Sequence, residues 1–198
     1  MTNAAVLHRR SLVLADLLPG ALVRDGLLVA GAAGFVGLVA QISVHLPFTP
    51  VPITGQTLGV LLAGTALGWR RAGLALALYL VAGVAGVPWF AGGASGYAGL
   101  APSFGYIVGF VAAAALCGYL AERGADRNVV KALPAMLAGE IVIYAFGLTW
   151  LALDLHLSAS ATLAEGFTPF LVGDIVKAAI AAGLLPAAWR LVRGRRAG

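Results

Sequence analysis

Two oppositely charged residues, Asp174 and Lys177, lie three positions apart in the last long apolar segment, within the stretch F-L-V-G-D-I-V-K. If this segment is helical, positions i and i+3 share one face, so the two side chains lie together. A charge at membrane depth costs at least about 2.5–3.5 kcal/mol, and such residues are usually kept for a ligand, an ion or a buried partner. We therefore expect a ligand with hydrogen-bond donors for Asp174 and an anionic group for Lys177. Mutual neutralisation within the helix is the alternative.

The composition places that segment in a membrane. The 198 residues are 61% hydrophobic and only 11% charged, with a mean hydropathy of +0.94. We read six apolar spans at 27–44, 56–68, 71–88, 103–121, 132–153 and 168–189. Most approach the ~20 residues that cross a bilayer as a helix, and their continuity excludes the alternating segments of a β-barrel. The predicted fold class is an all-α membrane protein, a bundle of six transmembrane helices.

The basic residues orient this bundle. The chain has 13 Lys and Arg and a net charge of +5. All but Lys177 lie before span one, after span six, or in the connections between spans two and three and between spans four and five. By the positive-inside rule, both termini are then cytoplasmic. We expect a multi-pass protein of the cell membrane that does not bind nucleic acid, and the exception, Lys177, marks the functional segment.

We expect one membrane domain, 1–198. Its parts are a cytoplasmic or interfacial segment 1–26, a six-helix bundle 27–190 and a basic cytoplasmic tail 191–198. The first segment is predicted to hold an interfacial amphipathic helix, with Leu14, Leu17, Leu18 and Leu22 facing lipid.

Two unusual connections lie on the outer side of this topology. His45–Gly55 is apolar but contains three prolines, which disfavour a helix, so we expect it to fold over the bundle as a lid. Gly86–Pro102 contains five glycines, which allow close approach to a bound molecule, and the aromatic residues Trp89, Phe90 and Tyr97. Together with Asp174 and Lys177, they predict an outward-facing pocket for a largely hydrocarbon ligand.

Other residues at depth leave alternatives open. Glu140, near the middle of span five, could pair with Lys177, hydrogen-bond while protonated, or line the pocket. Cys117 is expected to pack between helices, and no metal site or cofactor is predicted.

In span one, Ala30, Ala33 and Gly34 belong to small-xxx-small patterns, which let two helix backbones approach closely. These residues pack either within the bundle or against another subunit.

Four motifs occur in order along the chain: P-F-T-P-V-P-I-T-G-Q-T (Pro47–Thr57), G-V-P-W-F-A-G-G-A-S-G (Gly86–Gly96), P-S-F-G-Y (Pro102–Tyr106) and F-L-V-G-D-I-V-K (Phe170–Lys177). Together they resemble the biotin-specific S component, the substrate-binding membrane subunit, of energy-coupling factor (ECF) transporters. The resemblance covers roughly residues 27–190.

The resemblance implies a subunit that captures biotin from outside and works with a transmembrane T component and two ABC ATPases. It implies ligand contacts from Asp174 and Lys177, a polar contact near the ureido ring from Ser95 with Tyr97 nearby, and lid contacts from Thr54 and Gln56. It also implies docking through Ala30, Ala33 and Gly34. Self-association is the alternative partnership.

Two other functions fit the residues less well. One is an S component or carrier for a different small amphiphilic molecule. The other is a rhomboid-like intramembrane serine protease, because Gly93–Gly96 reads G-A-S-G with Ser95 as a nucleophile. That chemistry needs a histidine base, and His8, His45 and His156 all lie outside the predicted spans. We therefore expect a transporter subunit and not an enzyme.

Overall fold

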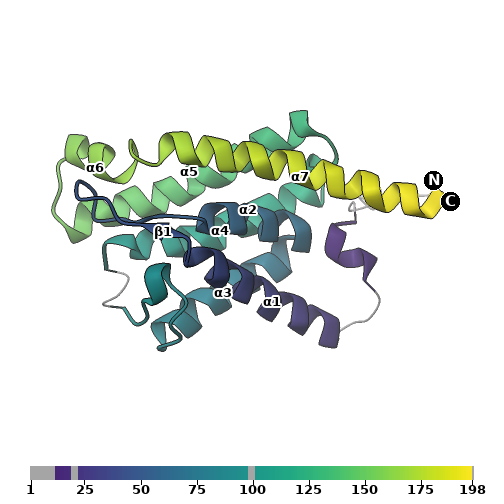
Figure 1. Cartoon of the computed structure of the whole chain (residues 1–198), viewed down its shortest axis with the longest axis horizontal. Coiled ribbons are helices and arrows are strands. Elements are labelled where there is room, and N and C mark those ends of the chain that lie inside the picture. The colour runs from purple at the N-terminus through teal and green to yellow at the C-terminus, as the bar shows by residue number, and fades with distance from the viewer. Residues whose placement is uncertain (1–11, 19–21, 98–100, 198) are drawn as a thin grey trace, which may run out of the picture.

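The computed structural model describes residues 12–18, 22–97 and 101–197 and is almost entirely helical (Figure 1). The helices are α1 (Leu22–Ala40), α2 (Gln56–Leu67), α3 (Trp69–Val84), α4 (Phe104–Ala121), α5 (Val129–Asp154), α6 (Ala159–Gly166) and α7 (Leu171–Ala197). Short 3-10 turns are η1 (Leu14–Leu17), η2 (Ala91–Gly93), η3 (Ala101–Ser103) and η4 (Ala125–Arg127). The strands β1 (Ser43–Val44) and β2 (Ile53–Thr54) form one antiparallel pair.

Each predicted span corresponds to a helix, with shifted ends. Within the described residues, four helices are long and apolar enough to cross a membrane: Leu22–Ala40, Ala101–Ala121, Val129–Asp154 and Leu171–Val192. The helices α2 and α3 are shorter, with 12 and 16 residues. The helix α7 continues through the predicted tail 191–198 as far as Ala197.

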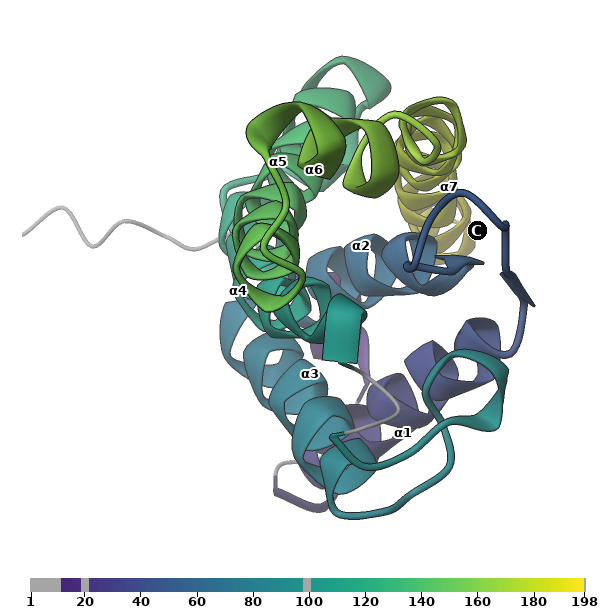
Figure 2. The same cartoon turned by 90° about the vertical axis from the view of Figure 1, so that its left-hand side faces the viewer.

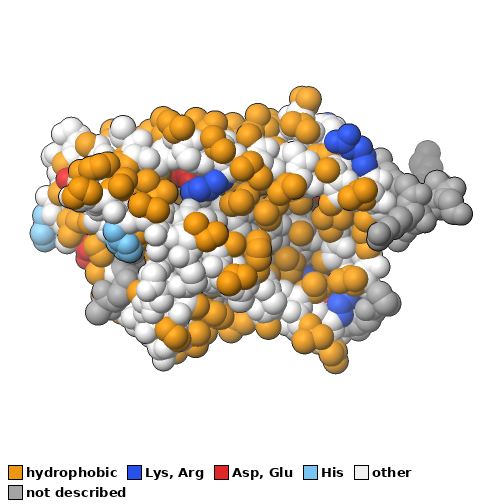
Figure 3. Space-filling view, in the orientation of Figure 1, with side chains coloured by type: hydrophobic (Ala, Val, Ile, Leu, Met, Phe, Trp, Pro, Cys, Tyr) orange, Lys and Arg blue, Asp and Glu red, His pale blue; other side chains and the backbone are white. Residues whose placement is uncertain are grey.

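The molecule has two different ends. The end of α7 and the turn η1 lie at the right of Figure 1, whereas α6 and the β1–β2 pair lie at the left. Figure 2 looks onto the left end, with α6 at the top, the loop that follows α1 at the right and the loop that follows α3 at the lower right. The space-filling view in Figure 3 shows hydrophobic side chains spread over one whole face, with Lys and Arg gathered mainly at the right.

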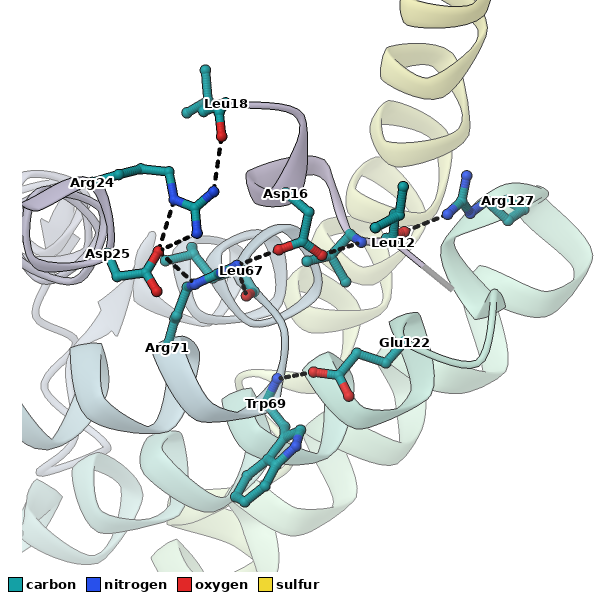
Figure 4. A network of polar contacts seen from close by, with 11 residues as sticks. Leu12, Asp16, Leu18, Arg24, Asp25, Leu67, Trp69, Arg71, Glu122 and Arg127 are labelled. Carbon is teal, nitrogen blue, oxygen red and sulfur yellow. Dashed lines mark hydrogen bonds and ion pairs between the residues drawn. The ribbon is translucent and has the colours of Figure 1, made fainter. Parts of the chain in front are cut away.

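The N-terminal segment differs from our expectation. Residues 12–18 form a 3-10 turn that packs on the bundle, with Val13 and Ala15 buried and Leu14 against a buried cluster of α2, α4, α5 and α7. Leu14 therefore does not face lipid as predicted, whereas Leu18 and Leu22 are exposed. Polar contacts hold this segment to the helix ends. Arg71 donates to Asp16 at 2.7 Å, Arg24 donates to the Leu18 carbonyl at 2.8 Å, and Arg127 donates to the Leu12 carbonyl (Figure 4).

The loop after α3 is fixed from three helices. The Trp89 indole donates to the Tyr79 carbonyl at 2.9 Å, and the Tyr79 hydroxyl donates to the Trp89 carbonyl at 3.1 Å. From α2, the Gln56 amide donates to the Tyr79 hydroxyl at 2.7 Å. Gln41, just after α1, donates to the carbonyl of Phe90 at 3.2 Å. This buried network sets the position of the glycine-rich loop at one end of the bundle.

Close helix packing in the bundle depends on glycine at Gly118 in α4. A Cβ atom added there would lie 2.5 Å from backbone atoms of Gly68 and Trp69, in the turn between α2 and α3. Backbone atoms cannot rotate away, so Gly118→Ala should destabilise the fold by about 1–3 kcal/mol, the usual range for overpacking. We expect a lower melting temperature in detergent. Gly183→Ala in α7 is the matched control, since nothing lies within 4 Å of its added Cβ. Equal melting temperatures for the two variants would contradict this packing.

Candidate functional site

A cavity of about 180 Å³ lies between the loops at one end of the molecule and the helices α2, α4, α5 and α7. The loop between β1 and β2 contributes Pro50, Val51 and Pro52 to its wall. This segment therefore covers part of the cavity, as expected for a lid. Other wall residues are Phe90, Ala91 and Ala94 from the glycine-rich loop, Tyr106, Ile107 and Phe110 from α4, Ile143 and Tyr144 from α5, and Phe170 before α7. Most of the wall is apolar or aromatic.

The charged residues of α7 form a polar site in this wall. Lys177 Nζ donates to Asp174 Oδ1 at 2.9 Å, and both side chains line the cavity. The Thr57 hydroxyl donates to Asp174 Oδ1 at 3.1 Å and accepts from Lys177 Nζ at 3.1 Å. The Tyr144 hydroxyl donates to the other Asp174 oxygen. The two charged side chains therefore neutralise each other and also adjoin an open volume.

Two further predicted residues, Thr54 and Gln56, also line the cavity. The Thr54 hydroxyl donates to Gln56 Oε1 at 2.9 Å, while Gln56 Nε2 donates to Tyr79. Because both ends of the Gln56 amide have partners, the residue holds the wall in place as well as presenting polar atoms to the cavity.

Sequence reasoning missed several residues of the site. Thr57 lies inside the Pro47–Thr57 motif and follows Gln56, but its contact with α7 joins residues 117 positions apart. Tyr144 carries a hydroxyl group within an apolar span, at about the same membrane depth as Asp174. A polar group at that depth could have identified Tyr144 as a site residue. His45 lies outside the predicted spans, yet it lines the cavity, as does Ser103.

A family model for the BioY family matches residues 8–194, nearly the whole chain. The chain belongs to the BioY family. "Biotin transporter BioY" of Rhizobium etli is 40% identical over 170 residues, which are 80% of this chain and 89% of that protein. "Probable biotin transporter BioY" of Pyrococcus horikoshii is 39% identical over 155 residues, 78% of this chain and 89% of its own.

A solved structure is similar to this BioY fold. The crystal structure at 2.1 Å of the S-component for biotin from an ECF-type ABC transporter superposes with a TM-score of 0.77. The match covers 85% of this chain and 92% of the other, at 25% identity.

Two residues that the resemblance implies near the ligand do not line the cavity. Among the described residues, Ser95 and Tyr97 are not part of the cavity wall, and Ala94 takes that place. The Tyr97 ring packs instead on Phe104, with centroids 5.3 Å apart, and on Trp150. The cause is the tight turn at Gly92 and Gly93, both with positive φ, which turns Phe90 and Ala94 toward the cavity side of the loop.

The small residues of α1 divide between two faces of this BioY helix. Ala33 is fully buried in the core, and Gly37 on the same face lies against Trp89. Ala33 is therefore unavailable for docking, because its face already packs within the bundle. Ala30 and Gly34 are exposed, and nothing lies within 4 Å of a Cβ added to Gly34.

Proposed function

We propose that this chain is the biotin-binding S component of an ECF-type transporter and serves biotin uptake. The observation that carries this proposal is the Asp174–Lys177 pair, which lies in the wall of an otherwise apolar cavity. Biotin has two ureido N–H donors, an apolar thioether ring and a carboxylate tail. Because the Asp174 and Lys177 side chains touch each other, the flexible carboxylate tail must fold back toward the ureido ring. In this folded form Asp174 accepts from the ureido group, Lys177 pairs with the carboxylate, and the rings of Phe90, Tyr106 and Phe110 pack on the apolar body.

The membrane arrangement is part of this proposal. In this arrangement α1, α2, α3, α4, α5 and α7 cross the cell membrane, with α2 and α3 as short spans, and the cavity opens to the outside. Support comes from the basic residues Arg24, Arg71 and Arg127, which contact the segment 12–18 (Figure 4). The turn η1 of that segment lies at the end of the molecule opposite α6 and the β1–β2 pair (Figure 1). By the positive-inside rule, that end and both termini face the cytoplasm.

The partners are those of an ECF transporter, a T component and two ABC ATPases. The exposed Ala30 and Gly34 of α1 offer the small-residue face on which a partner helix can pack. Self-association through the same face is the alternative, and the mass of the complex purified from the native membrane separates the two. The BioY relatives are transporters, so the protease alternative with Ser95 finds no support.

Calorimetric titration of the purified protein with biotin tests the function. We expect saturable binding of biotin and much weaker binding of its methyl ester, which carries no charge for Lys177. No binding of biotin would refute the assignment, and tighter binding of another amphiphile would favour a different substrate.

Thr57→Val should weaken biotin binding by roughly tenfold. Valine has nearly the same shape but lacks the hydroxyl that bridges Asp174 and Lys177, and hydrogen bonds to charged groups contribute about 1.5–3 kcal/mol. The titration above measures the change. The matched control is Thr149→Val in α5, whose hydroxyl bonds only to the Ala145 carbonyl within its own helix. If both variants bind biotin like the wild type, Thr57 does not organise the site.

A further inference from the structure

Glu140 is a buried carboxyl group that the proposed binding site leaves unexplained. The residue is 5% exposed, and neither of its side-chain oxygens has a hydrogen-bond partner among the residues that the structure describes. An ionised carboxylate without a partner is very costly in a low-dielectric interior, so such a group holds a proton or gains a counter-charge.

The position of Glu140 relates it to the ligand-binding pair. The helices α5 and α7 pack together and run in opposite directions (Figure 1). Tyr144 of α5 donates to Asp174 of α7, which fixes the register of the two helices. Glu140 lies one helical turn from Tyr144, and Lys177 lies about one turn from Asp174 in the same direction along the bundle. Glu140 on α5 is therefore close to Lys177 on α7, one helical turn from the contact between Tyr144 and Asp174.

The charged neighbours of Glu140 come from α7, which packs against its helix. Asp174 and Lys177 on α7 both interact electrostatically with it. Glu140 also interacts electrostatically with Tyr144 on the same helix and with Cys117 on α4. The Cys117 thiol donates to the Ala135 carbonyl. The helix α2, which packs here as well, carries no ionisable side chain. Lys177 is thus the one cation among these neighbours in the described structure.

We propose that Glu140 is a proton-binding site linked to ligand binding through Lys177. This inference rests on the proposed function. With Glu140 protonated, the ammonium of Lys177 is shared by Asp174 and the ligand carboxylate. When Glu140 releases its proton to solvent, its carboxylate becomes a third anion around that ammonium and competes with the ligand. An anionic ligand is therefore bound together with one proton on Glu140.

The sign of the pH dependence follows from this competition. Biotin affinity is highest from mildly acidic to neutral pH, where the ligand carboxylate is charged, and falls as the pH rises and Glu140 ionises. Linkage of one proton lowers the affinity by at most about tenfold per pH unit in the ionised range. Glu140→Gln keeps the shape of the protonated side chain and cannot ionise, so this variant should bind biotin with a flat pH profile. The methyl ester, which does not need Lys177, should show little pH dependence with the wild type.

Titrations from mildly acidic to alkaline pH, with the full chain in lipid nanodiscs, test the proposal. Glu165→Gln in α6 is the matched control and should keep the wild-type profile. Proton uptake is counted from binding heats in buffers with different ionisation enthalpies, which needs only the wild type if Glu140→Gln fails to fold. An equal pH profile for wild type and Glu140→Gln, or no proton uptake by the wild type at alkaline pH, would overturn the proposal.

Infrared difference spectroscopy separates this inference from the proposed function, because it requires no biotin. A carboxylic acid band that disappears in Glu140→Gln and persists in Glu165→Gln supports a proton on Glu140. A spectrum without such a band overturns the proposal. Failure of the wild type to bind biotin at every pH would refute the proposed function, while the infrared result would still decide whether Glu140 carries a proton.

Discussion

Lys177→Met should lower the affinity for biotin by at least about 30-fold, because truncating one partner of a buried charge pair costs about 2–5 kcal/mol. Methionine keeps the length of the side chain but removes the cation that binds the ligand carboxylate. The change also leaves Asp174 with only the Thr57 and Tyr144 hydroxyls as donors.

The methyl ester of biotin isolates the contribution of the charge. Calorimetry should show a large loss for the acid and a small loss for the ester. Lys131→Met is the matched control, since Lys131 is exposed in the first turn of α5 at the end away from the cavity. If Lys177→Met binds the acid as tightly as the wild type does, Lys177 does not bind the carboxylate.

Asp174→Asn should weaken the binding of biotin and of its methyl ester together, by roughly 10- to 100-fold. The ureido group is common to both ligands, and hydrogen bonds to an ionised acceptor contribute about 1.5–3 kcal/mol. The substitution also removes the charge that compensates Lys177 in the protein interior. This parallel loss distinguishes Asp174 from Lys177, whose substitution acts mainly on the acid.

Calorimetry with both ligands measures the change, and the melting temperature shows whether the variant is folded. Asp154→Asn, at the end of α5, is the control and should bind both ligands normally. A variant at Asp174 that loses the acid but retains the ester would contradict a role in ureido recognition.

The hydrophobicity of the chain and the free-energy cost of a charge inside a membrane were sufficient to predict the helical fold and the charged residues of the site. Each long apolar run became a helix, because a helix satisfies its own backbone hydrogen bonds wherever its side chains lie. Asp174 and Lys177 were recognisable because charged residues are so costly at that depth. The prolines of His45–Gly55 predicted a non-helical segment, and that segment does cover the cavity.

The structure differs from the predictions where a side chain's position depends on a local turn or on residues far away in the sequence. Whether Ser95 or Ala94 faces the cavity depends on the turn at Gly92 and Gly93, where glycine permits several backbone conformations. The apolar pattern of 12–18 fits a lipid-facing helix equally well, and its contacts with Arg71 and Arg127, far along the chain, cannot be read from the segment itself. Tyr144 and Thr57 became site residues through the packing of α5 and α2 on α7.

The ion pair on α7 has a consequence for selectivity. Since Lys177 is already matched by Asp174 and Thr57, a chloride or sulfate ion that approached the ammonium would gain little attraction and would offer no donor to the neighbouring carboxylate. Only a solute with an acceptor and donors at the right separation satisfies both groups at once. We therefore expect small inorganic anions to bind this pocket weakly, because they lack both the hydrogen-bond donors for Asp174 and an apolar body for the aromatic wall.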